Sequence, residues 1–313
     1  MPRRLHQLLA PSSPRRRTTG AAVLVAVLGA GLLTATGAVA SAPPGGTPDR
    51  GNATYVARGD SFAAGNGTGV PDLDPTCRRS SLAYAPLVAA ERPRTDLRFV
   101  ACSGADTGTV LDNQISSLDR GTDFVTLSVG GNDVGFGEVA KVCVAGTEAQ
   151  CLLAAQESAF AATAQLPGRL DAVYAAVGDR VRKAEVVVVG YPRFFPLNFP
   201  EGFDSFSPFD STRPCPNAFG VTAGEAAALN GLTDTLNKVI ADRATAAGFT
   251  YLSPVEAFTG HDMCASDPWV NGVLVPDLLD AYHPSRAGYR QGYAPLIAAE
   301  LQRQPSVSRR LTA

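Results

Sequence analysis

The sequence of 313 residues predicts an α/β fold, built on a central parallel sheet of about five strands. Strand-like and helix-like segments alternate along the chain, which is the pattern of a parallel sheet covered by helices on both faces. The segment 185–190 (EVVVVG) carries four consecutive valines, as expected for a strand that is buried on both faces. Short polar motifs follow several of the strand-like segments, at the sheet edge where ligands of such folds bind.

Five short runs of apolar and β-branched residues are the predicted strands. The first run ends at Gly59, and the third ends at Gly130 and Gly131. The fourth is the valine run, and the last is a short apolar segment before a proline. The predicted strands occupy residues 54–58, 97–101, 123–129, 185–190 and 249–252.

Helical patterns lie between and after these strands. Residues 152–177 form a long alanine-rich region, and residues 223–247 place their leucines on one stripe, as an amphipathic helix does. Pro284 suits the first turn of the last helix, where a missing N–H costs nothing. The predicted helices occupy residues 80–91, 110–118, 152–177, 223–247 and 284–302.

The first 40 residues differ from the rest of the chain. They hold five arginines and no acidic residue, followed by an apolar run over residues 21–33 and the small residues Ala38-Val39-Ala40. This order is typical of a secretory signal peptide, and the run is shorter than the roughly 20 residues that span a membrane. We predict cleavage after Ala40, without stable membrane insertion, by a Sec or a twin-arginine route. Residues 41–53 are then a linker, 54–305 one catalytic domain and 306–313 a tail.

The charge of the exported part excludes one class of partner. Without the leader the chain has 22 basic and 29 acidic residues, for a net charge of −7. Proteins that bind nucleic acid usually show a basic excess, so we expect no nucleic-acid partner.

All six cysteines lie after the leader. There is no C-x-x-C motif, which argues against a zinc ribbon or a thioredoxin-type redox site. An even number of cysteines in an exported chain indicates disulfides, and six cysteines allow 15 connectivities. We favour sequential pairing because it closes short loops: Cys77 with Cys102, Cys143 with Cys151, and Cys215 with Cys264.

Three polar motifs follow predicted strands. Ser61, in Gly59-Asp60-Ser61, stands where a strand-to-helix turn exposes a nucleophilic hydroxyl. Gly104 allows its backbone N–H to approach an oxyanion closely, and the Asn132 side chain is a second donor of the same kind. Each motif alone also fits an ordinary turn, because these are common turn residues.

Histidine is scarce, which narrows the choice of a catalytic base. His6 lies in the leader, so only His261 and His283 remain. Asp280 stands three residues before His283, where its carboxylate can bond the second ring nitrogen and stabilise the imidazolium. Alone, this pair also fits a surface Asp and His beside a helix cap.

Taken in order, these four motifs resemble the four blocks of the SGNH (GDSL) hydrolase superfamily, over residues 54–305. The six cysteines and the segment 260–264 (GHDMC) resemble those of secreted, Streptomyces-type lipases and esterases with three sequential disulfides. The resemblance implies a three-layer α/β/α, flavodoxin-like fold and ester hydrolysis without metal or cofactor. The Gly-x-Ser-x-Gly motif of the α/β-hydrolases is absent, which argues against that fold.

The resemblance also implies a role for each residue. Ser61 is the nucleophile, and its own N–H, the Gly104 N–H and the Asn132 side chain form the oxyanion hole. His283 is the general base and then the general acid, and Asp280 orients it. Some members of this group use a backbone carbonyl in place of the carboxylate, and that alternative stays open.

The substrate is less defined by the sequence. Residues 191–209 hold seven aromatic residues after the fourth strand, either as an apolar rim for an acyl chain or as a loop packed on itself. The glycine-rich loop 65–69 lacks the spacing of a nucleotide site, so we assign it to the site rim. We predict a monomeric, secreted serine esterase or lipase that hydrolyses apolar acyl esters.

Two other functions fit the same sequence. A polysaccharide acetyl esterase or a phospholipase would use the same scaffold, but a carbohydrate site favours aromatic platforms and Trp269 is the only tryptophan. A non-catalytic secreted binding domain is the other alternative, and the four intact motifs argue against it.

Overall fold

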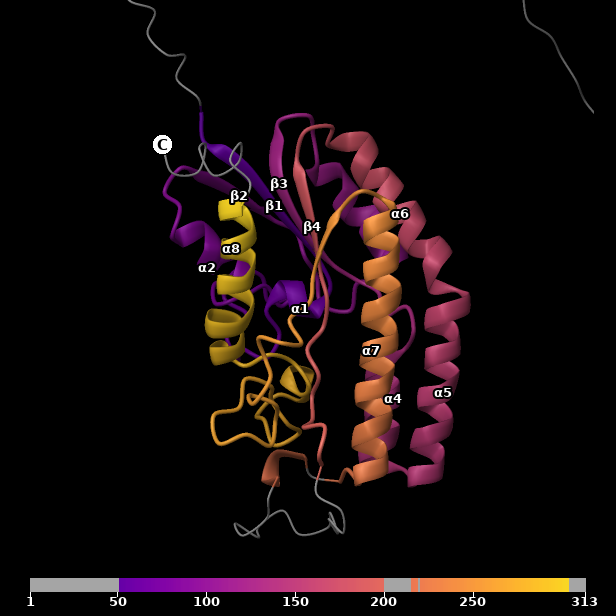
Figure 1. The fold of residues 1–313 in the computed structure, drawn as a ribbon. Helices are drawn as coiled ribbons and strands as arrows, with labels where there is room; N and C mark the ends of the chain where they lie inside the picture. The colour runs from indigo at the N-terminus through magenta and orange to yellow at the C-terminus, as the bar shows by residue number, and fades with distance from the viewer. Residues whose placement is uncertain (1–50, 200–214, 219, 304–313) are drawn as a thin grey trace, which may run out of the picture. The chain divides into compact units, whose positions relative to one another are not determined.

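A computed structural model describes residues 51–199, 215–218 and 220–303, and all structural statements concern these residues. The predicted leader, most of the predicted linker and the predicted tail lie outside them. Five strands form one parallel sheet in the order β2-β1-β3-β4-β5 (Figure 1). The strands are β1 (Ala53–Gly59), β2 (Thr95–Phe99), β3 (Thr122–Ser128), β4 (Glu185–Val189) and β5 (Thr250–Leu252).

Helices cover both faces of the sheet. In Figure 1, α2 (Tyr84–Ala90) and α8 (Ala294–Arg303) lie on one side of the strands, and α6 (Leu166–Arg180) and α7 (Ala223–Ala246) lie on the other. This three-layer arrangement confirms the predicted fold class, and the valine strand β4 is buried between the layers.

The remaining elements are short or lie beside the sheet. They are α1 (Ser61–Ala64), α3 (Thr107–Thr109), η1 (Val110–Gln114), η2 (Ile115–Ser117), α4 (Phe136–Ala145), α5 (Glu148–Ala164), η3 (Pro216–Ala218), η4 (Leu278–Asp280) and η5 (Gly288–Tyr293). Figure 1 shows α4 and α5 beside α7, extending past the carboxyl ends of the strands.

Some predicted boundaries are corrected. The alanine-rich region is two helices, because α5 ends at Ala164 and Pro167 falls in the first turn of α6. The helix α4 was not predicted. Pro284 is not helical: it pairs with Val270 in an isolated bridge, ahead of the last helical segment. The edge strand β2 starts at Thr95, two residues earlier than predicted. Its side chains alternate between exposed and half-buried, so polar residues interrupt the apolar run on which the prediction was based.

The three sequential disulfides are present. Cys77 pairs with Cys102, Cys143 with Cys151, and Cys215 with Cys264. The second of these bonds joins α4 to α5. No helix within the described residues has the length and apolarity needed to cross a membrane.

Arg58 on β1 is a charged residue inside the core. It is fully buried, and no acceptor in the described part of the chain bonds any of its guanidinium nitrogens. Burial lowers the pKa of Arg58 to about 10. A basic group whose pKa is lower in the folded state than in the unfolded state destabilises the fold when it is charged. The free-energy cost of burying Arg58 is therefore fully present below about pH 10.

We therefore expect Arg58→Leu to raise the free energy of unfolding by about 1–3 kcal/mol, because it removes an unsatisfied buried cation. Urea unfolding followed by circular dichroism measures this. Arg98→Leu is the matched control, since Arg98 is exposed and paired with Asp119, and it should change stability little. A lower midpoint for Arg58→Leu would contradict the interpretation.

Candidate active site

The end of β1 places Ser61 at the carboxyl edge of the sheet. Gly59 has φ +125°, and a Cβ there would lie 2.1 Å from the Ser128 carbonyl oxygen, so only glycine allows β1 to end so close to β3. Asp60 caps α1 by accepting a 3.0 Å hydrogen bond from the Phe62 N–H. This turn leaves the Ser61 side chain on the wall of a cavity.

Ser61 and His283 are in direct contact. Ser61 Oγ lies 2.7 Å from His283 Nε2, and His283 Nδ1 lies 2.8 Å from the Ala281 carbonyl oxygen. Because a carbonyl can only accept, Nδ1 carries the proton and Nε2 accepts from the Ser61 hydroxyl. This is the tautomer in which histidine can take a proton from serine.

The His283 side chain is half-buried, with Phe62 packed at 4.8 Å between ring centroids. Desolvation lowers its pKa to about 4, although the bond to Ala281 and the charge of Asp280 act in the opposite direction. The ring is therefore a neutral base near pH 7, and the neutral form is lost only as the pH falls through about 4.

The predicted contact between Asp280 and His283 is corrected. The buried Asp280 carboxylate accepts hydrogen bonds from the Gly67 N–H at 2.8 Å and from Arg78 at 2.7 Å. The chain turns at Tyr282, with φ +56°, and this turn sets the Ala281 carbonyl against Nδ1 instead. The backbone carbonyl, which the sequence left as the alternative, is the group that orients the ring.

The three predicted oxyanion donors line the same cavity as Ser61 and His283. Asn132 Nδ2 donates to the Ala105 carbonyl at 2.9 Å, which orients the amide and leaves its second N–H available. Within the described residues, no acceptor takes the Ser61 or the Gly104 backbone N–H. Asp133 holds the loops together, since it accepts from the Thr107 N–H at 3.0 Å.

Sequence reasoning missed the contacts that support the turn at Ser61. The Tyr191 hydroxyl donates to Asp60 Oδ2 at 2.5 Å and accepts from the Gly131 N–H at 3.2 Å, so it links the ends of β1, β3 and β4. Burial raises the pKa of Asp60 to about 7. The position of Tyr191 just after the valine strand was the available signal. The sequence left its ring open between an acyl-chain rim and a loop packed on itself, and in the structure it lines the cavity.

The cavity itself is mainly apolar and has a volume of about 550 Å³. Phe194, from the aromatic segment, forms part of its wall, whereas Phe195 and Phe199 are buried in the core. Phe203, Phe206 and Phe209 lie outside the described residues. Much of the apolar lining of the cavity comes from α4, α7 and the loops beside them: Phe136, Ala140, Val144, Ala145, Leu236, Val273, Leu278 and Leu279.

Across residues 51–199, 215–218 and 220–303, no group of three or more histidine, cysteine, aspartate or glutamate side chains is arranged to hold a metal ion. The disulfides account for every cysteine.

Residues 57–291 match the model of the GDSL-like Lipase/Acylhydrolase family. The chain is 38% identical to Lipase 1 of Streptomyces coelicolor over 244 residues, which are 78% of this chain and 85% of that protein. It is 37% identical to a lipase of Streptomyces rimosus over the same shares of the two chains.

Two solved structures have the same fold at similar identity. The crystal structure of the extracellular lipase from Streptomyces rimosus aligns with TM-score 0.71 and 35% identity, over 79% of this chain and 99% of that one. The crystal structure of phospholipase A1 from Streptomyces albidoflavus NA297 aligns with the same score and coverage, at 40% identity. The predicted resemblance is thereby confirmed: the chain belongs to the GDSL-like lipase/acylhydrolase family and is a carboxylic ester hydrolase.

Proposed function

We propose that this enzyme is a secreted serine lipase or esterase that cleaves esters of apolar acyl chains, with Ser61 as nucleophile and His283 as base. The observation that carries the proposal is the 2.7 Å contact between Ser61 Oγ and His283 Nε2 on the wall of an apolar cavity. A serine activated by a correctly protonated histidine is the arrangement that acyl transfer needs.

The catalytic cycle follows from this geometry. His283 Nε2 takes the Ser61 proton as Oγ attacks the ester carbonyl, and the Ala281 carbonyl holds the Nδ1 proton of the resulting imidazolium. The Ser61 N–H, the Gly104 N–H and the Asn132 amide stabilise the oxyanion. His283 then gives its proton to the leaving alcohol, and water cleaves the acyl-enzyme by the same route.

The cavity supports an apolar acyl group. Its volume of about 550 Å³ lies in the range of small-molecule sites, and its walls are largely aliphatic and aromatic. Leu278 and Leu279 line it and are also 73% and 59% exposed, so the apolar surface continues out of the cavity. The names of the relatives, lipases and a phospholipase A1, agree with such substrates.

The preference for acyl-chain length tests this substrate class. With p-nitrophenyl esters from acetyl upward, we expect kcat/KM to rise about fourfold for each buried methylene, near 0.8 kcal/mol each, until the cavity is filled. The rise should be absent in Ser61→Ala. Preference for acetyl esters, or faster cleavage of acetylated xylan, would favour the carbohydrate esterase instead, and a phospholipid substrate would be shown by release of a fatty acid.

Gly137 offers a matched variant for this test. It lines the cavity from α4, and a Cβ added there meets nothing within 4 Å. Gly137→Phe should therefore lower kcat/KM for long chains while leaving acetyl esters unaffected.

We also propose export with cleavage after Ala40, and action as an extracellular monomer. The three disulfides and the extracellular lipase of Streptomyces rimosus support the extracellular part of this proposal.

A further inference from the structure

The Cys77–Cys102 disulfide joins the segment that carries Arg78 to the loop that carries Gly104. Cys102 lies two residues before Gly104, and its partner Cys77 lies directly before Arg78. The Ser103 N–H also donates to the Cys77 carbonyl at 3.0 Å, so the backbone of the two loops is joined beside the covalent bond.

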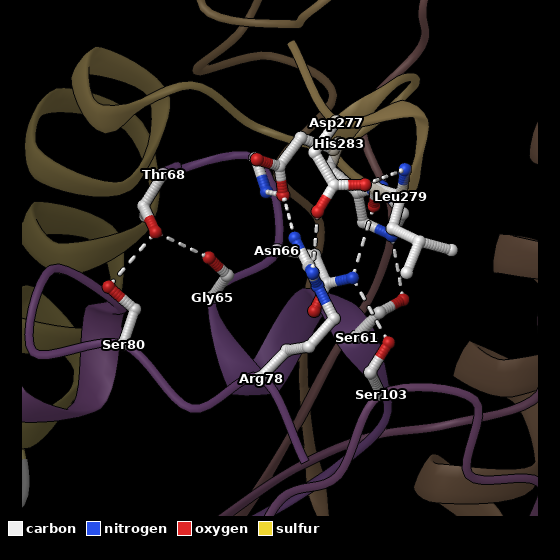
Figure 2. Close-up of polar contacts among 12 residues, drawn as sticks. Ser61, Gly65, Asn66, Thr68, Arg78, Ser80, Ser103, Asp277, Leu279 and His283 are labelled. Carbon is white, nitrogen blue, oxygen red and sulfur yellow. Dashed lines mark hydrogen bonds and ion pairs between the residues drawn. The ribbon is translucent and has the colours of Figure 1, made fainter. Parts of the chain in front are cut away.

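Arg78 reaches from this junction to the turn that carries His283. Its Nη2 lies 2.7 Å from Asp280 Oδ1, and its Nη1 lies 2.7 Å from Asp277 Oδ2. The side chains of Arg78 and Asp280 are only 14% and 8% exposed, so this ion pair is shielded from water. Figure 2 shows the Arg78 side chain extended toward Asp277.

The backbone at Arg78 is in an unusual conformation. Its φ of +55° lies in the left-handed region, which costs a non-glycine residue about 1 kcal/mol or more. The neighbouring disulfide and the two carboxylates are the contacts that hold it there. A strained residue held by its surroundings, in contact with an active-site turn, indicates a functional position.

Asn66 also connects the Gly104 loop to the turn that carries His283. Its Nδ2 donates to Ser103 Oγ at 3.0 Å and to the Leu279 carbonyl at 3.1 Å, and Figure 2 shows it between these residues. The Ser103 end adjoins the oxyanion donor Gly104, and the Leu279 end adjoins Asp280.

We propose that Arg78 is a positioning residue: anchored by the Cys77–Cys102 disulfide, it holds the His283 turn in register with the oxyanion loop through its ion pair with Asp280. The proposal rests on the assignment of His283 as the base. The sequence analysis placed the Asp280 carboxylate against the His283 ring. In this arrangement Asp280 acts instead through the backbone turn and through its charge.

The role of Arg78 can be measured, because the charges of Arg78 and Asp280 act on the pKa of His283. The Asp280 charge raises the pKa of His283, and the Arg78 charge lowers it. Among the described residues, the other ionisable groups that line the cavity or adjoin the turn are Asp60, Glu138, Lys141, Tyr191, Tyr282, Asp277 and Arg286, which donates to the Thr68 carbonyl. Lys141 is paired with Glu138, and Asp60 is bonded to Tyr191; neither pair is bonded to Arg78 or Asp280.

The test uses the small number of histidines. In the full chain with His6→Gln and His261→Gln, His283 is the only histidine, so its imidazole signals in nuclear magnetic resonance report its titration without ambiguity. His261 stacks on Trp269 and does not line the cavity. Arg78→Met, Asp280→Asn and their double variant are compared in this background, with Arg98→Met as the control.

Opposite shifts are the expected result. Arg78→Met leaves the Asp280 charge unbalanced and should move the His283 titration to higher pH, whereas Asp280→Asn should move it to lower pH. The double variant should titrate between them. Turnover of Arg78→Met should fall on the order of tenfold or more with little change in KM, since small displacements of a catalytic group slow the reaction, and Arg78→Lys should recover part of it.

Two results would overturn the proposal. Unchanged titration midpoints in the variants would show that the ion pair does not act on His283, and unchanged turnover in Arg78→Met would show that it positions nothing. If Arg78→Met does not fold, the Asp280→Asn variant is decisive. A downward shift of the His283 titration midpoint supports the proposal, and an unchanged midpoint contradicts it. Labelling of Ser61 by a fluorophosphonate tests the proposed function separately, since that function stands even if Arg78 has no effect.

Discussion

Replacing Ser61 by alanine is expected to lower kcat for ester hydrolysis by at least about 10⁴-fold, because no acyl-enzyme can form without its hydroxyl. The Oγ atom is the group in contact with His283 Nε2, and no other serine hydroxyl bonds that nitrogen in the described part of the chain. Initial rates with p-nitrophenyl esters at saturating substrate measure the loss.

The fold of Ser61→Ala should stay intact, because the cap of α1 is made by Asp60 and the backbone. Ser81→Ala is the matched control: its hydroxyl bonds the exposed Asp72 and lies outside the cavity, so its turnover should equal that of the unaltered enzyme. Retention of more than about a tenth of the activity in Ser61→Ala would mean that another nucleophile does the chemistry.

Asn132→Ala is expected to lower kcat by about 10²–10³-fold, which is the usual cost of one lost oxyanion donor. KM should change little, because the donor acts mainly in the transition state. The Asn132 amide makes one hydrogen bond within the described chain, to the Ala105 carbonyl, so the fold should survive its loss.

Asn132→Asp sharpens this test. It keeps the shape of the side chain but puts an anion where the oxyanion forms, so it should lose at least as much activity as Asn132→Ala. Asn113→Ala, on an exposed asparagine, is the control. Near-normal turnover in both Asn132 variants would remove this residue from the oxyanion hole.

Sequence reasoning found the parts of the site that depend on strand ends. Ser61, Gly104 and Asn132 each follow a strand, and parallel strands bring their carboxyl ends to one edge, so their meeting was predictable. The scarcity of histidine left His261 and His283 as candidates, and the Asp280 spacing together with the family resemblance selected His283. Comparison with known proteins confirmed the family and the fold class.

The missed features depend on three-dimensional geometry. Nothing in the spacing of Asp280 and His283 shows that the backbone turns at Tyr282 and presents the Ala281 carbonyl to Nδ1. Arg78 is 202 residues from Asp280 in sequence, and only the folded chain brings them together. Pro284 fits a first helical turn equally well by sequence, but its pairing with Val270 takes precedence.

The most direct test of the account is covalent labelling with a fluorophosphonate, followed by peptide mass spectrometry. We expect one adduct per chain, located on Ser61, absent in Ser61→Ala and much slower to form in His283→Gln. An adduct on a different serine, or full esterase activity in a chain that the probe does not label, would contradict it.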